Sequence, residues 1–138
     1  MKHCRTFEHT ADMGLEAHAD TIEELFEALG EGLAEVICPR RQVAARQMRV
    51  LEVAAEDLEA LAVDFLSAVL NVIEGQRFAL AAVRVIHADS GAIRAEVSGE
   101  PLDPSRHRIE REVKAVTYHQ LQVVHEGGQW LGRVILDI

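Results

Sequence analysis

Several features that mark specialised protein classes are scarce in this chain. Cysteine occurs only at positions 4 and 38 with no CxxC pair, too few for a disulfide framework, so we expect two reduced thiols. No apolar run reaches the roughly 18 residues of a membrane span, and the first residues lack a signal-peptide core, which predicts a cytoplasmic protein without a membrane partner. Aromatic residues make up 4% of the chain, and Tyr118 and Trp130 make a poor base-stacking platform.

Positive charge is missing from a long stretch that begins near the start of the chain. No Lys or Arg lies between Thr6 and Ile37, whereas many Asp and Glu do, and the formal net charge is −9. A field of this sign repels phosphate backbones, so we expect no direct nucleic-acid binding and favour a basic protein surface or a metal ion as partner. A solvated acidic helix face that keeps the protein soluble fits most of these residues equally well.

The apolar pattern predicts one globular α+β domain over residues 1–138, with 49% hydrophobic residues. Thr21 with Glu24 is typical of a capping box and opens a helix that ends before Pro39. A second helix is expected over 57–74. Strands are expected over 5–9, 15–19, 50–53, 78–87, 92–99, 112–125 and 130–138, with a turn at 10–14 and a tight hairpin at 88–91. Two helices should therefore pack against a mostly antiparallel or mixed β-sheet.

Three oxygen anions stand at the two ends of the chain. Asp12 follows the first strand, and Asp137 stands beside the α-carboxylate of Ile138. The apolar residues before Asp137 indicate that the terminus is held, whereas most termini fray. Three converging carboxylates favour Ca²⁺, Mg²⁺ or Mn²⁺ over zinc. The alternative is that Asp12 is a turn former and Asp137 a solvated tail residue.

A second candidate group lies in the segments 103–107 and 112–119. Strand alternation predicts two faces, one with Lys114, Val116 and Tyr118 and the other with Val113, Ala115, Thr117 and His119. So many polar side chains in one strand suggest a surface cluster with a function. A strand with one wet face and a satisfied histidine is the alternative.

Motifs of the common enzyme classes are missing. His9, His107 and His119 could bind zinc with a carboxylate, but their spacing matches neither HExxH nor a Cys/His pair. There is no GxSxG elbow, Walker loop or GxGxxG. The sequence therefore offers no motif of a zinc hydrolase, a serine nucleophile or a nucleotide site.

Four ordered motifs resemble the archease family over essentially the whole chain. They are Phe7–Gly14 (FEHTADMG), Gly99-Glu100-Pro101 with Asp103-Pro104 and His107, Glu112–His119 (EVKAVTYH), and Arg133–Ile138 (RVILDI). The resemblance implies an α+β protein that is not itself an enzyme and that activates an RtcB-type RNA ligase, promoting its guanylylation and repeated turnover in tRNA splicing or RNA repair.

The resemblance also implies site residues and a cofactor. The family's metal site carries over to Asp12, Asp137 and Ile138, with Ca²⁺ as the first choice and Mg²⁺ or Mn²⁺ as alternatives. The family's functional lysine carries over to Lys114, and we add His9, His107, Thr117, Tyr118 and His119 as ligase-interaction candidates. The Ala- and Arg-rich body departs from archaeal members, which leaves RNA repair and tRNA splicing both open. There are two alternatives to a ligase activator. One is a chaperone-like adaptor with a structural metal, and the other is an enzyme with its own hydrolytic metal site.

Overall fold

The structure is a computed structural model that describes residues 1–9 and 12–138, with the backbone only for Glu8 and His9. Its elements are β1 (His3–His9), β2 (Asp12–Ala19), α1 (Ile22–Ile37), the 3-10 helix η1 (Arg40–Gln42), β3 (Gln47–Ala54), α2 (Leu58–Leu70), the π-helical turn η2 (Asn71–Gly75), β4 (Phe78–Ala88), β5 (Ala92–Pro101), β6 (Ala115–Glu126) and β7 (Gln129–Asp137). None of the helices in these ranges is long and apolar enough to cross a membrane.

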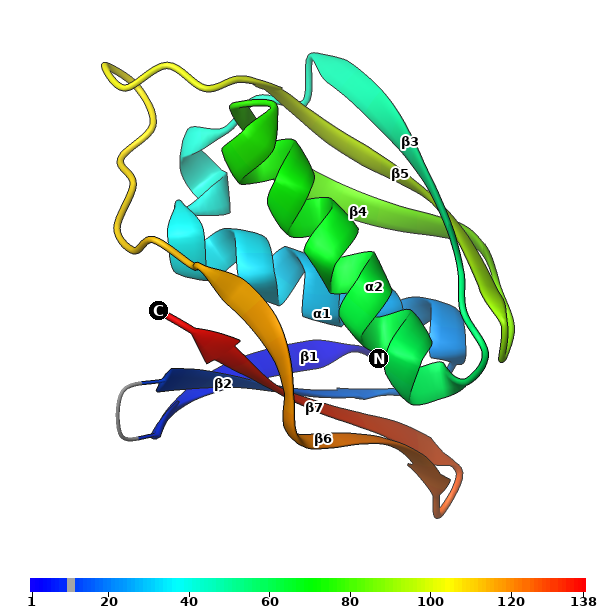
Figure 1. Ribbon diagram of the computed structural model, residues 1–138. Helices are drawn as coiled ribbons and strands as arrows, with labels where there is room; N and C mark the ends of the chain where they lie inside the picture. Colours follow the sequence, from blue (N-terminus) through cyan, green and yellow to red (C-terminus); the bar gives the residue numbers. More distant parts are fainter. Residues whose placement is uncertain (10–11) are drawn as a thin grey trace.

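The strands form two antiparallel sheets, with the orders β1-β2-β7-β6 and β3-β5-β4. Figure 1 shows both helices between the two sheets, and each helix contacts strands of both. The predicted α+β class and its two helices are confirmed. The strands divide between two sheets, so the helices are covered on two sides.

Both helices begin at the residues that the sequence indicates. The Thr21 hydroxyl accepts the N–H of Glu24 at 3.1 Å, and the Asp57 carboxylate accepts the N–H of Ala60 at 2.8 Å. These bonds satisfy amides that a helix start leaves without an intrahelical partner. The predicted end of the second helix near Glu74 is close, but its last turn is a π-helix.

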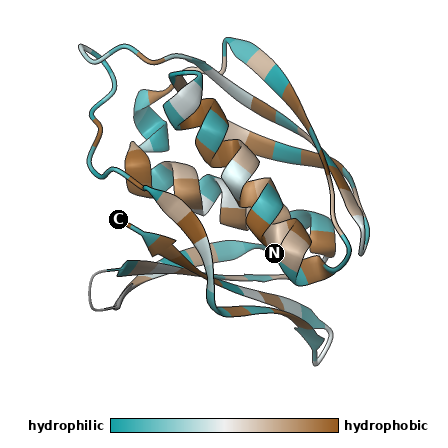
Figure 2. Cartoon of the chain, in the orientation of Figure 1, coloured by the Kyte–Doolittle hydropathy of each residue, from teal (hydrophilic) through white to brown (hydrophobic). Residues whose placement is uncertain are grey.

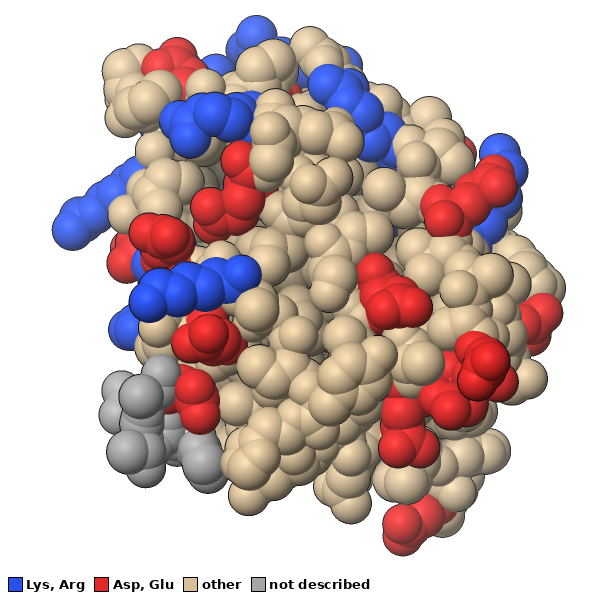
Figure 3. Space-filling model, in the orientation of Figure 1, with Lys and Arg blue, Asp and Glu red and all other residues tan. Residues whose placement is uncertain are grey.

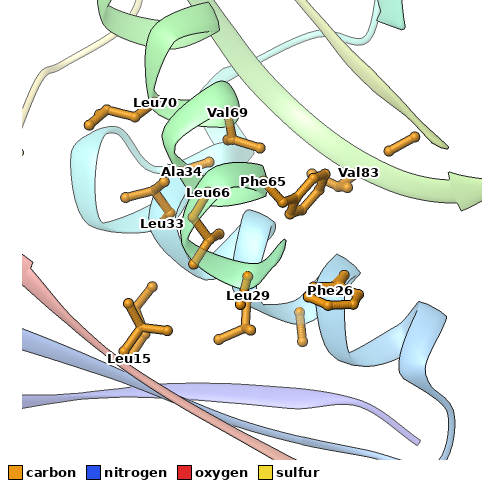
Figure 4. Packing of buried hydrophobic residues seen from close by; sticks show 14 of the residues in the cluster. Leu15, Phe26, Leu29, Leu33, Ala34, Phe65, Leu66, Val69, Leu70 and Val83 are labelled. Atoms are coloured by element: carbon orange, nitrogen blue, oxygen red, sulfur yellow. The ribbon is translucent and has the colours of Figure 1, made fainter. Parts of the chain in front are cut away.

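The core lies where the two helices meet the sheets. Figure 4 shows Leu15 from β2, Leu29 from α1, and Phe65 from α2, with Val83 of β4 on the opposite side. Gly32 lets β1 approach α1, since a Cβ there would lie 2.5 Å from the Cys4 sulfur. Both cysteines are free thiols, as predicted, and burial raises the pKa of Cys4 to about 11.

The acidic side of α1 lies along the free edge of strand β4. Glu27 accepts the N–H of Val85 at 2.9 Å, and Glu31 accepts the N–H of Val83 at 3.0 Å. Lys2 forms ion pairs with both carboxylates, at 3.0 and 3.5 Å. These two glutamates therefore close a sheet edge, and the alternative of a solvated acidic helix face is wrong for them.

Most predicted strand boundaries differ from the structure by one to three residues, and two of these differences have a clear physical cause. Strand β2 begins at Asp12, so the predicted turn at 10–14 ends earlier, and its residues 10 and 11 lie outside the described part. The cause is long-range pairing, because Asp12 to Gly14 pair with Asp137 to Ile135. The last long strand begins at Ala115 rather than Glu112, because residues 108–114 form backbone bonds with other segments. Figure 2 shows that this stretch before β6 is mostly hydrophilic.

Candidate functional site

Two carboxylate residues from opposite ends of the chain face each other in the four-stranded sheet. The register pairs Asp12 of β2 with Asp137 of β7, and Asp137 with Ala115 of β6 on its other side. Directly opposed residues of antiparallel strands point to the same face, with Cβ atoms roughly 4.5–5.5 Å apart. Because Leu15 and Leu136 fill the core face, Asp12 and Asp137 lie on the outer face.

The end of the chain is held by the neighbouring strands. Strand β7 lies between β2 and β6, and the N–H of Lys114 donates to the Asp137 carbonyl at 2.7 Å. The Ile138 side chain is half-buried against the core. The chain end is therefore held one residue beyond the Asp12–Asp137 pair, and the convergence of all three carboxylates stays a prediction.

Opposed like charges destabilise a sheet unless something compensates them. Among the described residues, no Lys or Arg ion pair reaches Asp137, and no three His, Cys, Asp or Glu side chains form a metal-binding group. The available donors are two aspartates and the α-carboxylate of Ile138, all oxygen atoms. This donor set fits a hard divalent cation and does not fit zinc, which favours nitrogen and sulfur. The metal itself stays a prediction.

An aromatic side chain next to this pair was missed by sequence reasoning. Phe7 pairs with Gly14 and lies flat across it, since a Cβ on Gly14 would lie 2.0 Å from the Phe7 ring. The Arg133 guanidinium stacks on the same ring, 4.2 Å from its centroid. Ile135 is buried beneath, although it belongs to the outer face. The sequence offered one clue, because Phe7 and Gly14 lie at positions that pair when β1 and β2 form a hairpin, and a glycine leaves room for an aromatic ring.

Lys114 lies directly before β6, beside Asp137. Its side chain is exposed at a groove of about 450 Å³ that the π-helical turn η2 also borders. The lining residues are Ser67, Leu70, Asn71, Glu74, Gly75, Glu112, Val113 and Lys114. The structure thus places the Lys114 backbone beside Asp137, in the loop rather than in a strand as predicted. The Lys114 side chain faces the groove on the helix side of the sheet, whereas Asp12 and Asp137 lie on the outer face.

His107 lies inside the protein, 1% exposed, and is not a surface residue. Its Nδ1 accepts the N–H of Asp103 at 2.9 Å, so Nε2 carries the proton and donates to Glu100 at 2.9 Å. Glu100 also accepts two bonds from Arg106 and one from the N–H of Ala44. These donors, Arg106 first, lower the pKa of the Glu100 carboxyl to about 2. The arrangement gives His107 a structural role.

The remaining candidates on β6 are spread out by a bulge. The register shifts between Thr117 and Gln122, and Gln120 has a φ of 52°, so the predicted alternation stops at Thr117. Thr117 is half-buried and donates to the Ile135 carbonyl at 2.9 Å. Tyr118 is 60% exposed, and His119 is also exposed. The His9 backbone pairs with Asp12, and its side chain lies outside the described part.

Comparison with known proteins identifies the family. The model of the Archease protein family matches residues 5–138. The archease of Pyrococcus abyssi is 37% identical over 142 residues, which cover 100% of both chains. The archease of Thermococcus gammatolerans is 38% identical over 142 residues, again with 100% of both chains covered.

Solved structures show the same fold. The solution structure of Methanobacterium thermoautotrophicum protein 1598 matches with a TM-score of 0.79 and 30% identity, covering 98% of each chain. The crystal structure of a Thermotoga maritima archease, described as a possible chaperone, matches with a TM-score of 0.66 over 97% of this chain and 96% of that chain. Its identity of 20% supports the fold alone. With the family model spanning nearly its whole length, the chain belongs to the archease family.

Proposed function

We propose that this protein is a non-catalytic activator of an RtcB-type RNA ligase, promoting guanylylation of the ligase and its multiple turnover. Family membership supports the proposal, and so does the lack of an enzyme motif in the sequence. The observation that carries it is the register that sets Asp12 opposite Asp137, beside Lys114 and the chain end. These are the residues that the resemblance to archeases assigns to the metal and to the ligase.

A divalent cation, Ca²⁺ before Mg²⁺ or Mn²⁺, would be held by Asp12, Asp137 and the terminal carboxylate of Ile138. Its chemistry there is to neutralise the opposed charges and join the two chain ends. The chain's own residues shape the surface around it. Phe7 and Arg133 cover the sheet beside the pair, and Lys114 supplies a cation at the rim for a phosphate or an acidic ligase residue.

An activator of this kind works by binding one state of the ligase better than another. A difference of about 1.4 kcal/mol in binding free energy shifts the ligase tenfold toward its guanylylation-competent state. Lys114 and Tyr118 are exposed near the site and can make such contacts. His107 is buried and is left out of the proposed contact surface.

The test follows the covalent ligase–GMP adduct and ligated RNA over repeated turnovers, with and without this protein. We expect the protein to restore turnover where the ligase alone stalls. The Lys114→Ala variant should lose most of this effect, whereas Asp64→Asn, an exposed change on α2, should keep it. Unchanged ligase turnover with the intact, metal-loaded protein would refute the proposal.

A second candidate function is a chaperone-like adaptor for RNA-processing enzymes with a purely structural metal. It is favoured by the description of the Thermotoga maritima archease as a possible chaperone. The two candidates differ in what Asp12→Asn does. Activation that survives this substitution, together with protection of unrelated enzymes from aggregation, would support the adaptor.

A further inference from the structure

Four arginines from two distant segments meet at one end of the molecule. Arg46 and Arg106 both reach the Glu100 carboxylate, at 3.6 and 2.9 Å. The backbone N–H of Arg108 donates to the Gln42 side chain at 2.8 Å, so the segment that carries Arg108 lies against the segment that carries Arg41. We call Arg41, Arg46, Arg106 and Arg108 the arginine cluster.

The buried Glu100 carboxylate fixes two members of this cluster in place. Its side chain is 3% exposed, whereas those of Arg46 and Arg106 are 69% and 44% exposed. Arg106 uses one N–H from each terminal nitrogen on Glu100, and its remaining N–H groups are left for another acceptor. A buried carboxylate thus holds two exposed guanidinium groups at the surface, which lowers the entropy cost of binding an anion.

The other two members have no acidic partner in the part of the chain that the structure describes. Arg41 and Arg108 are exposed, and no ion pair involves either of them there. Glu100 pairs with Arg46 and Arg106, and Asp103 lies near Arg106. Figure 3 shows many of the Lys and Arg side chains in the upper half of the molecule, where these segments lie in Figure 1, with single acidic residues among them and more acidic residues in the lower half.

We propose that the arginine cluster binds the phosphate backbone of RNA. Guanidinium forks match phosphate oxygens, and backbone contacts need cations rather than apolar surface. A protein partner would need a larger apolar centre, since the large exposed apolar side chains beside the cluster are Ile109 and Met48, and none lies within 41–46 or 103–108. The choice of RNA among phosphate polymers rests on the proposed function as a ligase activator.

This inference runs against the expectation of no direct nucleic-acid contact. That expectation came from the acidic residues between Thr6 and Ile37, which lie on β2 and α1. Two of them, Glu27 and Glu31, bond to the edge of β4 and pair with Lys2. Glu31 and Glu35 also pair with Arg40, so the acidic charge nearest to the arginine cluster is partly offset by cations.

The experiment measures binding of this protein alone to a labelled 20-nucleotide single-stranded RNA by fluorescence anisotropy between 20 and 200 mM salt. We expect binding at low salt. A plot of the logarithm of the binding constant against the logarithm of the salt concentration should have a slope of about −0.7 for each phosphate contacted. Arg41→Gln and Arg108→Gln should each weaken binding and reduce this slope by about 0.7. Neither residue makes a side-chain ion pair within the described ranges, so both variants should fold normally.

Arg84→Gln is the matched control, since Arg84 is 78% exposed on the three-stranded sheet and pairs only with Glu96 at 3.9 Å. No RNA binding at 20 mM salt, or an equal loss in the control, would overturn the inference. If Arg41→Gln and Arg108→Gln leave RNA binding unchanged but weaken the complex with the ligase, the cluster binds an acidic protein surface instead. Guanylylation of the ligase without RNA is a separate readout, so failure here leaves the activator proposal standing.

Discussion

Carboxylates are used in opposite ways on helix α1 and at the end of the chain. Glu27 and Glu31 stand one helical turn apart and accept the N–H groups of Val85 and Val83. The rise over four helix residues is about 6 Å, and two strand residues span roughly 6.8 Å, so the two repeats match. Asp12 and Asp137 instead face each other across paired strands.

The two regions differ in whether an added cation would stabilise the carboxylates. On α1 the charge is offset by strand amides and by Lys2, and the result is a protected sheet edge. At the chain end, opposed carboxylates gain from an added cation. The net charge of −9 therefore says little about binding surfaces until each carboxylate is assigned its partners.

The largest change in stability is expected for the two glutamates of α1 that bond to β4. Glu27→Lys and Glu31→Lys each remove an acceptor and leave a strand N–H unsatisfied near Lys2, which should lower the free energy of unfolding by about 1–3 kcal/mol each. Urea denaturation followed by circular dichroism measures it. Asp64→Lys makes the same charge change at an exposed position of α2 and should cost less than about 0.5 kcal/mol. Equal urea midpoints for the α1 variants and the Asp64→Lys variant would show that the β4 edge does not need these carboxylates.

Local patterns predicted most of the elements. The Thr21 capping box, the apolar stripes of both helices, and the hairpin at 88–91 all lie where the sequence indicates. Each of these signals acts over a few residues, within reach of a short sequence window. The convergence of the chain ends was also suggested, because an apolar strand pattern runs up to Asp137.

Features that depend on distant partners were not predicted. The start of β2 at Asp12 depends on β7, and the burial of His107 depends on Glu100 and the Ala44 segment. The bulge after Thr117 breaks the alternation without a Gly or Pro to mark it. The Val85 N–H, which donates to Glu27, lies 58 residues away on β4. None of these is encoded in local spacing.

A smaller effect concerns the two carboxylates at the chain end. Ca²⁺ should raise the unfolding temperature of the wild-type protein, because bound metal stabilises only the folded state. Asp12→Asn removes one of the proposed ligands, and a tenfold loss of Ca²⁺ affinity would reduce this stabilisation by about 1.4 kcal/mol. Thermal unfolding with and without Ca²⁺ measures it, with Asp64→Asn as control. An equal Ca²⁺-dependent rise in wild type and in Asp12→Asn would mean that no cation joins these carboxylates.

The smallest effect concerns a third carboxylate, on the same outer face as Asp12. Glu16 lies between Arg5, at 2.8 Å, and Arg133, at 3.1 Å, with His18 at 3.5 Å, and the Arg5 hydrogen bonds lower its pKa from 4.5. Since its folded pKa is the lower one, its contribution to stability is complete above about pH 4.5 and is lost as the pH falls toward the folded pKa.

Glu16→Gln should therefore cost up to about 1 kcal/mol of unfolding free energy at pH 7, and this difference from wild type should shrink below pH 4.5. Urea midpoints at pH 7, 4.5 and 3, in chelator, measure it. Glu126→Gln, an exposed change beside the β6–β7 turn, is the matched control and should show little difference at any pH. Because Glu16 already has two arginine partners, Ca²⁺ should leave its pH profile unchanged. If Ca²⁺ changes the pH dependence of the difference between Glu16→Gln and wild type, the cation binds at Glu16 rather than at Asp12 and Asp137.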